Sequence, residues 1–208
     1  MWFSVLIGVI AGYLLGNLNG AISMSVLVGK EDVRSKGSGN AGLTNFVRNY
    51  GAGNALFVIL IDGGKALIAC LTAGLLLEPY GLYHEGLALG GTAVMLGHVF
   101  PALMGFRGGK GILSGLFIAL TVDIRIGLLI LAVFLIAYLL TQYVSLGSIL
   151  AAVAFGTGFI VFYRDNAVIM LCGIFMAVLT IFMHRGNIAR LMKGQERKTK
   201  LFGKGKEA

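Results

Sequence analysis

The chain has 208 residues, of which 57% are apolar and only 12% are charged, and it carries a net charge of +8. A soluble globular domain has about 45–50% apolar and about 25% charged residues, so a water-soluble particle is excluded and a lipid bilayer must cover the apolar exterior. The basic excess is typical of the cytoplasmic edges of a membrane protein, and no motif for a nucleic-acid partner accompanies it. The only cysteines, Cys70 and Cys172, lie in apolar stretches, so neither a disulfide framework nor a metal site is predicted.

Apolar runs separated by polar segments predict the helices. In chain order they cover residues 2–28, 54–78, 85–105, 112–122, 126–141, 144–163 and 166–183. A helix needs about 20 residues to cross the hydrocarbon core, so 126–141 is marginal and 112–122 is short. The sequence Thr-Val-Asp-Ile-Arg at 121–125 divides these two runs, which are either two short helices or one long helix with a polar patch.

The distribution of basic residues favours two short helices. Lys and Arg are concentrated in segments 29–53 and 105–111 and in the tail that begins at residue 184. With seven spans, all three segments lie on one side, which the positive-inside rule makes cytoplasmic. We therefore expect an all-α bundle of seven transmembrane helices in the plasma membrane, with the N-terminus outside and the C-terminus in the cytoplasm. Residues 1–196 form a single membrane domain, and 197–208 are expected to form a basic, disordered tail.

Two opposite charges lie inside the second apolar run. Asp62 and Lys65 are three residues apart, so they share a helix face. Either charge alone at the bilayer centre costs roughly 2.5–3.5 kcal/mol on insertion scales. A structural ion pair is the favoured interpretation, and the alternative is that one of the two lines a substrate cleft.

The polar segment after the first run has the composition of an anion-binding loop. Its glycines allow successive backbone N–H groups to surround one anion, and an arginine can bind phosphate oxygens with two N–H groups. The alternative, an ordinary loop, is weakened by the density of small polar side chains. The candidate anion-binding residues are Gly37, Ser38, Gly39, Asn40, Thr44, Asn45 and Arg48.

Two further polar segments have similar character. In the first, Gly108, Gly109 and Gly111 surround Lys110, which suits close backbone approach to an anion, and His98 upstream is either a packing histidine or a proton acceptor. In the second, His184, Asn187 and Arg190 are three apart and project from about one helix face. The alternative for this last segment is a lipid-anchoring basic end, which we accept only from Lys198 onward. Together the segments predict a small phosphorylated ligand.

The three segments resemble the signature motifs of the acyl-phosphate-dependent glycerol-3-phosphate acyltransferases of bacterial membranes. The resemblance runs from Gly37 to Arg48, from Gly97 to Gly111 and from His184 to Glu196, in that order. Leu43 departs from the usual alanine. Residues 112–114, Ile-Leu-Ser, replace a more usual small-residue and threonine ending, although a hydroxyl survives at position 114.

The resemblance implies that an acyl group moves from acyl phosphate to the 1-hydroxyl of glycerol 3-phosphate, the first acylation of phospholipid synthesis. The products are lysophosphatidate and phosphate, the surrounding partner is membrane lipid, and no cofactor is needed. The His-x-x-x-x-Asp motif of thioester-dependent acyltransferases is absent, in agreement. A small transporter of phosphorylated or other anions is the main alternative; it predicts an internal repeat, and none is clear. A lipid-binding scaffold would leave the glycines around Lys110 unexplained.

The resemblance also assigns roles to residues. The implied catalytic residues are Ser38, Lys110, His184 and Asn187. The implied substrate-binding residues are Gly37, Gly39, Asn40, Thr44, Asn45, Arg48, His98, Gly108, Gly109, Gly111, Ser145 and Arg190. The general base is either a histidine, His98 or His184, or the phosphate of the substrate, and the resemblance favours the substrate phosphate.

Overall fold

A computed structural model of the protein describes residues 1–199, and within this range every regular element is helical, as predicted. The helices are α1 (Trp2–Gly16), α2 (Gly20–Gly29), α3 (Leu43–Tyr50), α4 (Ala55–Leu77), α5 (Tyr83–Val99), α6 (Ile112–Val122), α7 (Ile124–Thr141), α8 (Val144–Phe162), α9 (Ala167–Met183) and α10 (Arg185–Met192). Short 3-10 turns cover Val33–Ser35, Glu78–Tyr80 and Ala102–Met104.

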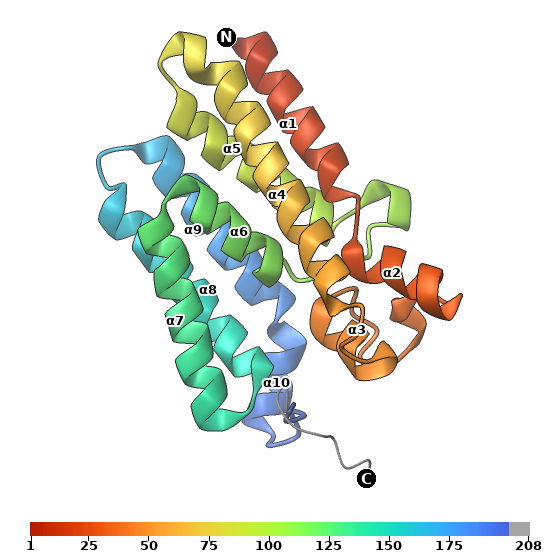
Figure 1. Ribbon diagram of the computed structural model, residues 1–208. Helices are drawn as coiled ribbons and strands as arrows, with labels where there is room; N and C mark the ends of the chain where they lie inside the picture. Colours follow the sequence, from red (N-terminus) through yellow and green to blue (C-terminus); the bar gives the residue numbers. More distant parts are fainter. Residues whose placement is uncertain (200–208) are drawn as a thin grey trace.

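The helices form two packed groups (Figure 1). Helices α1, α4 and α5 pack against one another, and α8 packs against both α7 and α9. Helix α6 joins the groups because it contacts α4 and α5 as well as α7, and α9 also contacts α5. A smaller apolar cluster that includes the fully buried Phe46 and Val58 fixes α2 and α3 beside α4. This arrangement holds the first polar segment against one end of the bundle.

Five helical segments are long and apolar enough to cross a membrane. They are Trp2–Gly29, Ala55–Tyr80, Tyr83–Met104, Ile124–Thr141 and Val144–Phe162. Helices α9 and α10, bent by 53° at their junction, make a sixth candidate, whereas α6 is apolar but only 11 residues long. The predicted run 2–28 is not one unbroken helix, because residues 17–19 separate α1 from α2.

Asp123 separates α6 from α7. Its backbone is extended (φ −155°, ψ 112°), and its carboxylate accepts a hydrogen bond from the backbone N–H of Arg125 at 2.9 Å, so it caps the start of α7. The chain reverses direction here (Figure 1). The alternative of one long helix over 112–141 is therefore wrong.

The buried Asp62–Lys65 pair satisfies the backbone at the break between α1 and α2. Lys65 Nζ donates to the carbonyl of Leu18 and, at 3.4 Å, to that of Gly16, and it lies 2.8 Å from Asp62 Oδ1. Asp62 Oδ1 also accepts from the N–H of Gly20, the first residue of α2, at 3.1 Å. These groups have no water to bond to inside a membrane, so the pair supplies their partners. The contacts support the structural interpretation of this pair.

The predicted tail over 197–208 is only partly described. Residues 197–199 are placed, and Thr199 is buried with its N–H bonded to the carbonyl of Gln142 at 3.0 Å. This part of the predicted tail therefore packs on the bundle, whereas residues 200–208 lie outside the described range.

Candidate active site

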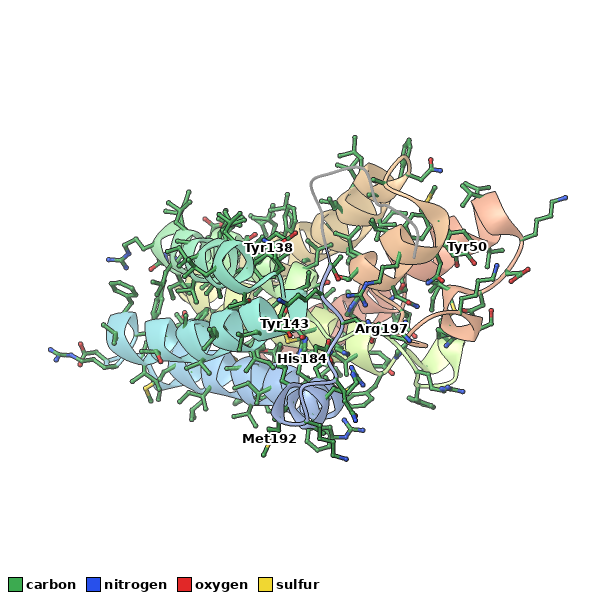
Figure 2. The ribbon with its side chains drawn as sticks, turned by 90° about the horizontal axis from the view of Figure 1, so that it is seen from below. Tyr50, Tyr138, Tyr143, His184, Met192 and Arg197 are labelled. Carbon is green, nitrogen blue, oxygen red and sulfur yellow. The ribbon has the colours of Figure 1, made fainter. Side chains whose placement is uncertain are left out.

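Four polar segments that are far apart in the sequence lie together at one end of the bundle, which Figure 2 views from below. They are residues 34–48, 105–111, 142–148 and 184–199. The first two are joined by Arg34, whose Nη1 donates to the carbonyls of Met104 at 2.7 Å and Arg107 at 2.8 Å. The tertiary structure thus brings all three predicted motifs together with the start of α8, where the predicted Ser145 lies.

The first segment is organised by the side chain of Asn45. Its Nδ2 donates to the carbonyls of Val33, Lys36 and Asn40 at 3.0–3.1 Å, and its Oδ1 accepts from the N–H of Ser38 at 3.0 Å. Asn45 is only 2% exposed. Because both of its polar atoms are used within the loop, its contacts favour a loop-shaping role over the predicted substrate contact.

The remaining polar groups of this loop are available to a ligand. Gly37 and Gly39 have φ of 60° and 69°, the left-handed region that favours glycine, and they expose Ser38 between them. Within residues 1–199, the hydroxyls of Ser38 and Thr44 accept and donate no hydrogen bond. Arg48 follows in the last turn of α3.

The glycines of the second segment bond back to the end of α5. The N–H of Gly108 donates to Val99 O and that of Gly109 to His98 O, both at 3.1 Å. A Cβ on Gly108 would overlap the carbonyl of His98, so glycine is needed for this close approach. These two N–H groups are therefore not free for the anion predicted to bind them. Gly111 (φ 85°) starts α6, and no side chain caps the free N–H groups of the first turn.

Lys110 lies at the centre of the charged cluster. Its Nζ donates to Oδ1 of Asn187 on α10. Burial lowers the pKa of Lys110 to about 8, and the positive charges of Arg190 and Arg48 act in the same direction, against the carboxylate of Glu196. An anion placed here would meet three cationic side chains and the N-terminal end of α6.

The third segment holds a carboxylate in this basic cluster. Glu196 Oε1 accepts from Asn187 Nδ2 at 2.9 Å, and its Oε2 accepts from Arg190 Nε at 2.7 Å. Burial raises the pKa of Glu196, but these hydrogen bonds outweigh it and leave the pKa below its usual value. Ser145 also helps to lower this pKa and so lies beside the carboxylate, yet its buried Oγ has no hydrogen-bond partner in the described part of the chain.

The two candidate histidines occupy different places. His184 is buried at the α9–α10 junction, with Nδ1 2.8 Å from the carbonyl of Thr180, so Nδ1 carries the proton and Nε2 is left as an acceptor. His98 Nδ1 instead lies 2.8 Å from Lys65 Nζ, in the buried cluster between the helices. Its backbone carbonyl accepts from Gly109, and its ring packs against Gly109, where a Cβ would overlap Nε2. These contacts favour a packing role for His98.

The sequence did not predict a role in the site for two residues, Glu196 and Thr199. It placed Glu196 within the third motif without giving it a role, although a carboxylate six residues after Arg190, among basic residues, is a natural ion-pair partner. It gave no role to Thr199, whose hydroxyl accepts a hydrogen bond from Arg48 Nη2. No local pattern marks Thr199, because its partner lies 151 residues away.

Known proteins are similar to this chain in both sequence and fold. The sequence model of the family described as glycerol-3-phosphate acyltransferase matches residues 6–194. Glycerol-3-phosphate acyltransferases of Finegoldia magna and Thermoanaerobacter pseudethanolicus are 38% and 39% identical to this chain, each over 94% of it and 96% of the relative. The crystal structure of PlsY, an integral membrane glycerol 3-phosphate acyltransferase, in its glycerol 3-phosphate form superposes with a TM-score of 0.84 at 33% identity, covering 95% of this chain and 96% of that one. This chain therefore belongs to the glycerol-3-phosphate acyltransferase family.

Proposed function

We propose that the protein transfers the acyl group of an acyl phosphate to the 1-hydroxyl of sn-glycerol 3-phosphate and releases lysophosphatidate and phosphate. The observation that carries this proposal is the convergence of Lys110, Arg48 and Arg190 on the N-terminal end of α6. Both substrates carry a phosphate group, so a shared site needs several cations. Similar PlsY structures exist in a glycerol 3-phosphate form and a lysophosphatidic acid form, which supports the assignment of the acceptor and the product.

An apolar cavity next to the charged cluster suits the acyl chain. In this structure it is narrow, with room for about 10 Å³, and its lining includes Gly111, Ile112, Met95, Phe155 and Thr180. Gly111 follows Lys110 directly, so a donor whose phosphate is bound by Lys110 would direct its chain toward this apolar lining, which has to open to admit the chain. A phosphate attached to an apolar chain is common to the acyl-phosphate donor and the lysophosphatidate product.

The residues suggest how the reaction proceeds. The glycerol 1-hydroxyl attacks the carbonyl carbon of the donor, and the bond from that carbon to the phosphate oxygen breaks as inorganic phosphate leaves. Lys110 and the N–H groups that start α6 stabilise the negative charge that develops on the carbonyl oxygen and the leaving group. Holding two anions side by side supplies much of the rate enhancement. The unpartnered hydroxyl of Ser145 is available to one of the two substrates.

The hydroxyl proton passes, in this proposal, to the phosphate of the substrate rather than to a histidine. A His184→Ala variant should therefore retain turnover within about tenfold of the wild type, since general base catalysis typically contributes about 10²–10⁴-fold. Phosphate release at saturating substrates measures this. A loss of three or more orders of magnitude, with unchanged thermal stability, would assign the proton transfer to His184.

The activity itself is tested with purified protein in detergent. Acyl phosphate is supplied with and without glycerol 3-phosphate, while phosphate release and lysophosphatidate formation are followed. We expect release that depends on glycerol 3-phosphate and matches lysophosphatidate mole for mole. Release without dependence on the acceptor would refute the acyltransferase. Uptake of glycerol 3-phosphate by sealed vesicles without acyl transfer would instead support an anion transporter.

We further propose seven spans, with α6 as the short one, the N-terminus outside and the site on the cytoplasmic face of the plasma membrane. Basic segments around Lys36 and Arg107 and beyond Arg185 support this orientation. Single cysteines introduced into a variant lacking both native cysteines test it. A cysteine at Gly81 should react with an impermeant maleimide on intact cells, and one at Lys36 only after lysis. The reverse pattern would invert the topology.

The pKa of Lys110 predicts a dependence of donor binding on pH. A lysine with a pKa of about 8 is charged below that pH and loses its charge above it, so kcat/KM for acyl phosphate should fall as pH rises through 8. The substrate phosphates are fully ionised above about pH 7 and do not contribute to this change. Initial rates between pH 7 and 9.5 measure the effect. In a Lys110→Arg control the charge persists, so an identical profile in both proteins would contradict the assignment.

A further inference from the structure

The residues that follow α10 cross the site and connect α10 to the turn between α7 and α8. Residues 195–199, which we call the C-terminal strap, leave α10 at Gly194, whose φ of 67° ends the helix. At the far end, the N–H of Thr199 donates to Gln142 O at 3.0 Å, and the hydroxyl of Tyr138 donates to Thr199 O at 2.9 Å. The strap therefore runs from α10 to the turn between α7 and α8. It lies beyond the end of the family match at residue 194.

The strap crosses the space between two halves of the site. In Figure 2, Arg197 lies between His184 and Tyr143 on one side and Tyr50, at the end of α3, on the other. Near its start, the strap is fixed by Glu196, whose side chain is 6% exposed and pairs with Arg190 at 2.7 Å. The strap is thus attached to α10 at its start and to the end of α7 and the turn before Ser145 at its far end.

Arg48 reaches the strap from α3. Its Nη2 donates to the hydroxyl of Thr199 and, at 3.5 Å, to the carbonyl of Arg197. An arginine side chain has five N–H donors, and within residues 1–199 these are the only protein acceptors of its guanidinium. The donors on Nε and Nη1 therefore remain for a ligand. Thr199 is 9% exposed and is held by two backbone hydrogen bonds, so its hydroxyl is a fixed acceptor.

We propose that Thr199 is a positioning residue, which holds the guanidinium of Arg48 in place for the phosphate group of a substrate. This inference rests on the proposed function, in which Arg48 binds phosphate. A long side chain that is ordered before the ligand arrives loses less conformational freedom on binding, so the affinity is higher. Thr199, which lies outside the family motifs, thereby restricts the conformations of Arg48, which lies inside the first motif.

The role is tested by removing the hydroxyl alone. Thr199→Val keeps the β-branched shape and both backbone hydrogen bonds, so the strap stays docked while Arg48 loses its hydroxyl acceptor and keeps only the 3.5 Å contact with the carbonyl of Arg197. We expect KM to rise about 3- to 10-fold, the usual cost of ordering one flexible side chain on binding. The affected substrate should be the one whose KM is raised by Arg48→Lys. The expected kcat stays within about twofold, because the chemical step does not involve Thr199.

Conservative and unrelated substitutions serve as controls. Thr199→Ser keeps the hydroxyl and should restore KM to within about twofold of the wild type. Thr121→Val removes a hydroxyl that bonds only to the carbonyl of Phe117 in its own helix, at 2.7 Å, and should leave KM unchanged. Thr199→Ala also removes the hydroxyl, and its KM should match that of Thr199→Val.

A double-mutant cycle separates positioning from a general structural effect. If Thr199 acts through Arg48, adding Thr199→Val to Arg48→Lys should change KM by less than about twofold. A full additional effect in the Arg48→Lys background, or an unchanged KM in Thr199→Val itself, overturns the proposal. The wild-type protein tests the proposed function separately. If it shows no transfer dependent on glycerol 3-phosphate, the acyltransferase fails; if it is active and Thr199→Val matches it, only the positioning role fails.

Discussion

Replacement of Lys110 with methionine is expected to lower kcat/KM for acyl phosphate by about 100- to 1,000-fold. This is the usual cost of removing one preorganised group that stabilises charge in the transition state. Lys110 is partly buried and lies between Asn187 and the start of α6. Methionine keeps the length of the apolar stem and removes only the charge. Initial rates of phosphate release at varied donor concentration measure the effect.

The controls for this variant distinguish chemistry from folding. The unfolding midpoint of Lys110→Met should equal or exceed that of the wild type, because a partly buried charge near Arg48 and Arg190 is removed. Lys110→Arg should retain part of the activity because it keeps the charge but not the geometry. Activity of Lys110→Met within tenfold of the wild type would exclude Lys110 from charge stabilisation.

Replacement of Lys65 with methionine is expected to destabilise the protein by about 3–5 kcal/mol. Removing one member of a buried ion pair leaves the other charge without compensation. Here the carboxylate of Asp62 would remain, with both side chains only 2% exposed, and the carbonyl of Leu18 would lose its donor. Equilibrium unfolding in mixed detergent micelles measures the change in the free energy of unfolding.

Two further variants test this explanation. Asp62→Asn combined with Lys65→Met removes both charges and keeps an acceptor for the N–H of Gly20, so the double variant should be more stable than Lys65→Met alone. Arg164→Met removes the exposed pair with Asp165, in which both side chains are at least 79% exposed, and should cost less than about 1 kcal/mol. Equal destabilisation by Lys65→Met and Arg164→Met would show that Lys65 does not compensate a buried charge.

The buried pair also affects the site at a distance. Lys65 Nζ contacts Nδ1 of His98, and the backbone carbonyl of His98 holds the N–H of Gly109, next to Lys110. The packing of α1, α4 and α5 therefore determines where the second motif lies. His98 thus connects the buried pair to the second motif through its ring and its backbone carbonyl.

The apolar runs of the sequence determined most of the helices. The run at 112–122 coincides with α6 because Gly111 and Asp123 end it on both sides, and these are local signals. Composition was sufficient to identify a membrane protein, since no other environment covers so many exposed apolar side chains. The three motifs, together with their order, were sufficient to identify the family.

Only the tertiary structure decided what individual groups in those motifs do. Asn45 is a residue type that often binds anions, yet its side-chain amide donates to three backbone carbonyls of its own loop. The N–H groups of Gly108 and Gly109 belong to an anion-binding pattern, yet the end of α5 accepts them. Thr199 carries no local signal and becomes informative only through Arg48. Hydrophobic periodicity and turn residues act over a few neighbouring positions, so the sequence displays them directly. A hydrogen bond between segments depends on which backbones the packed helices bring together, and that is decided only when the whole bundle forms.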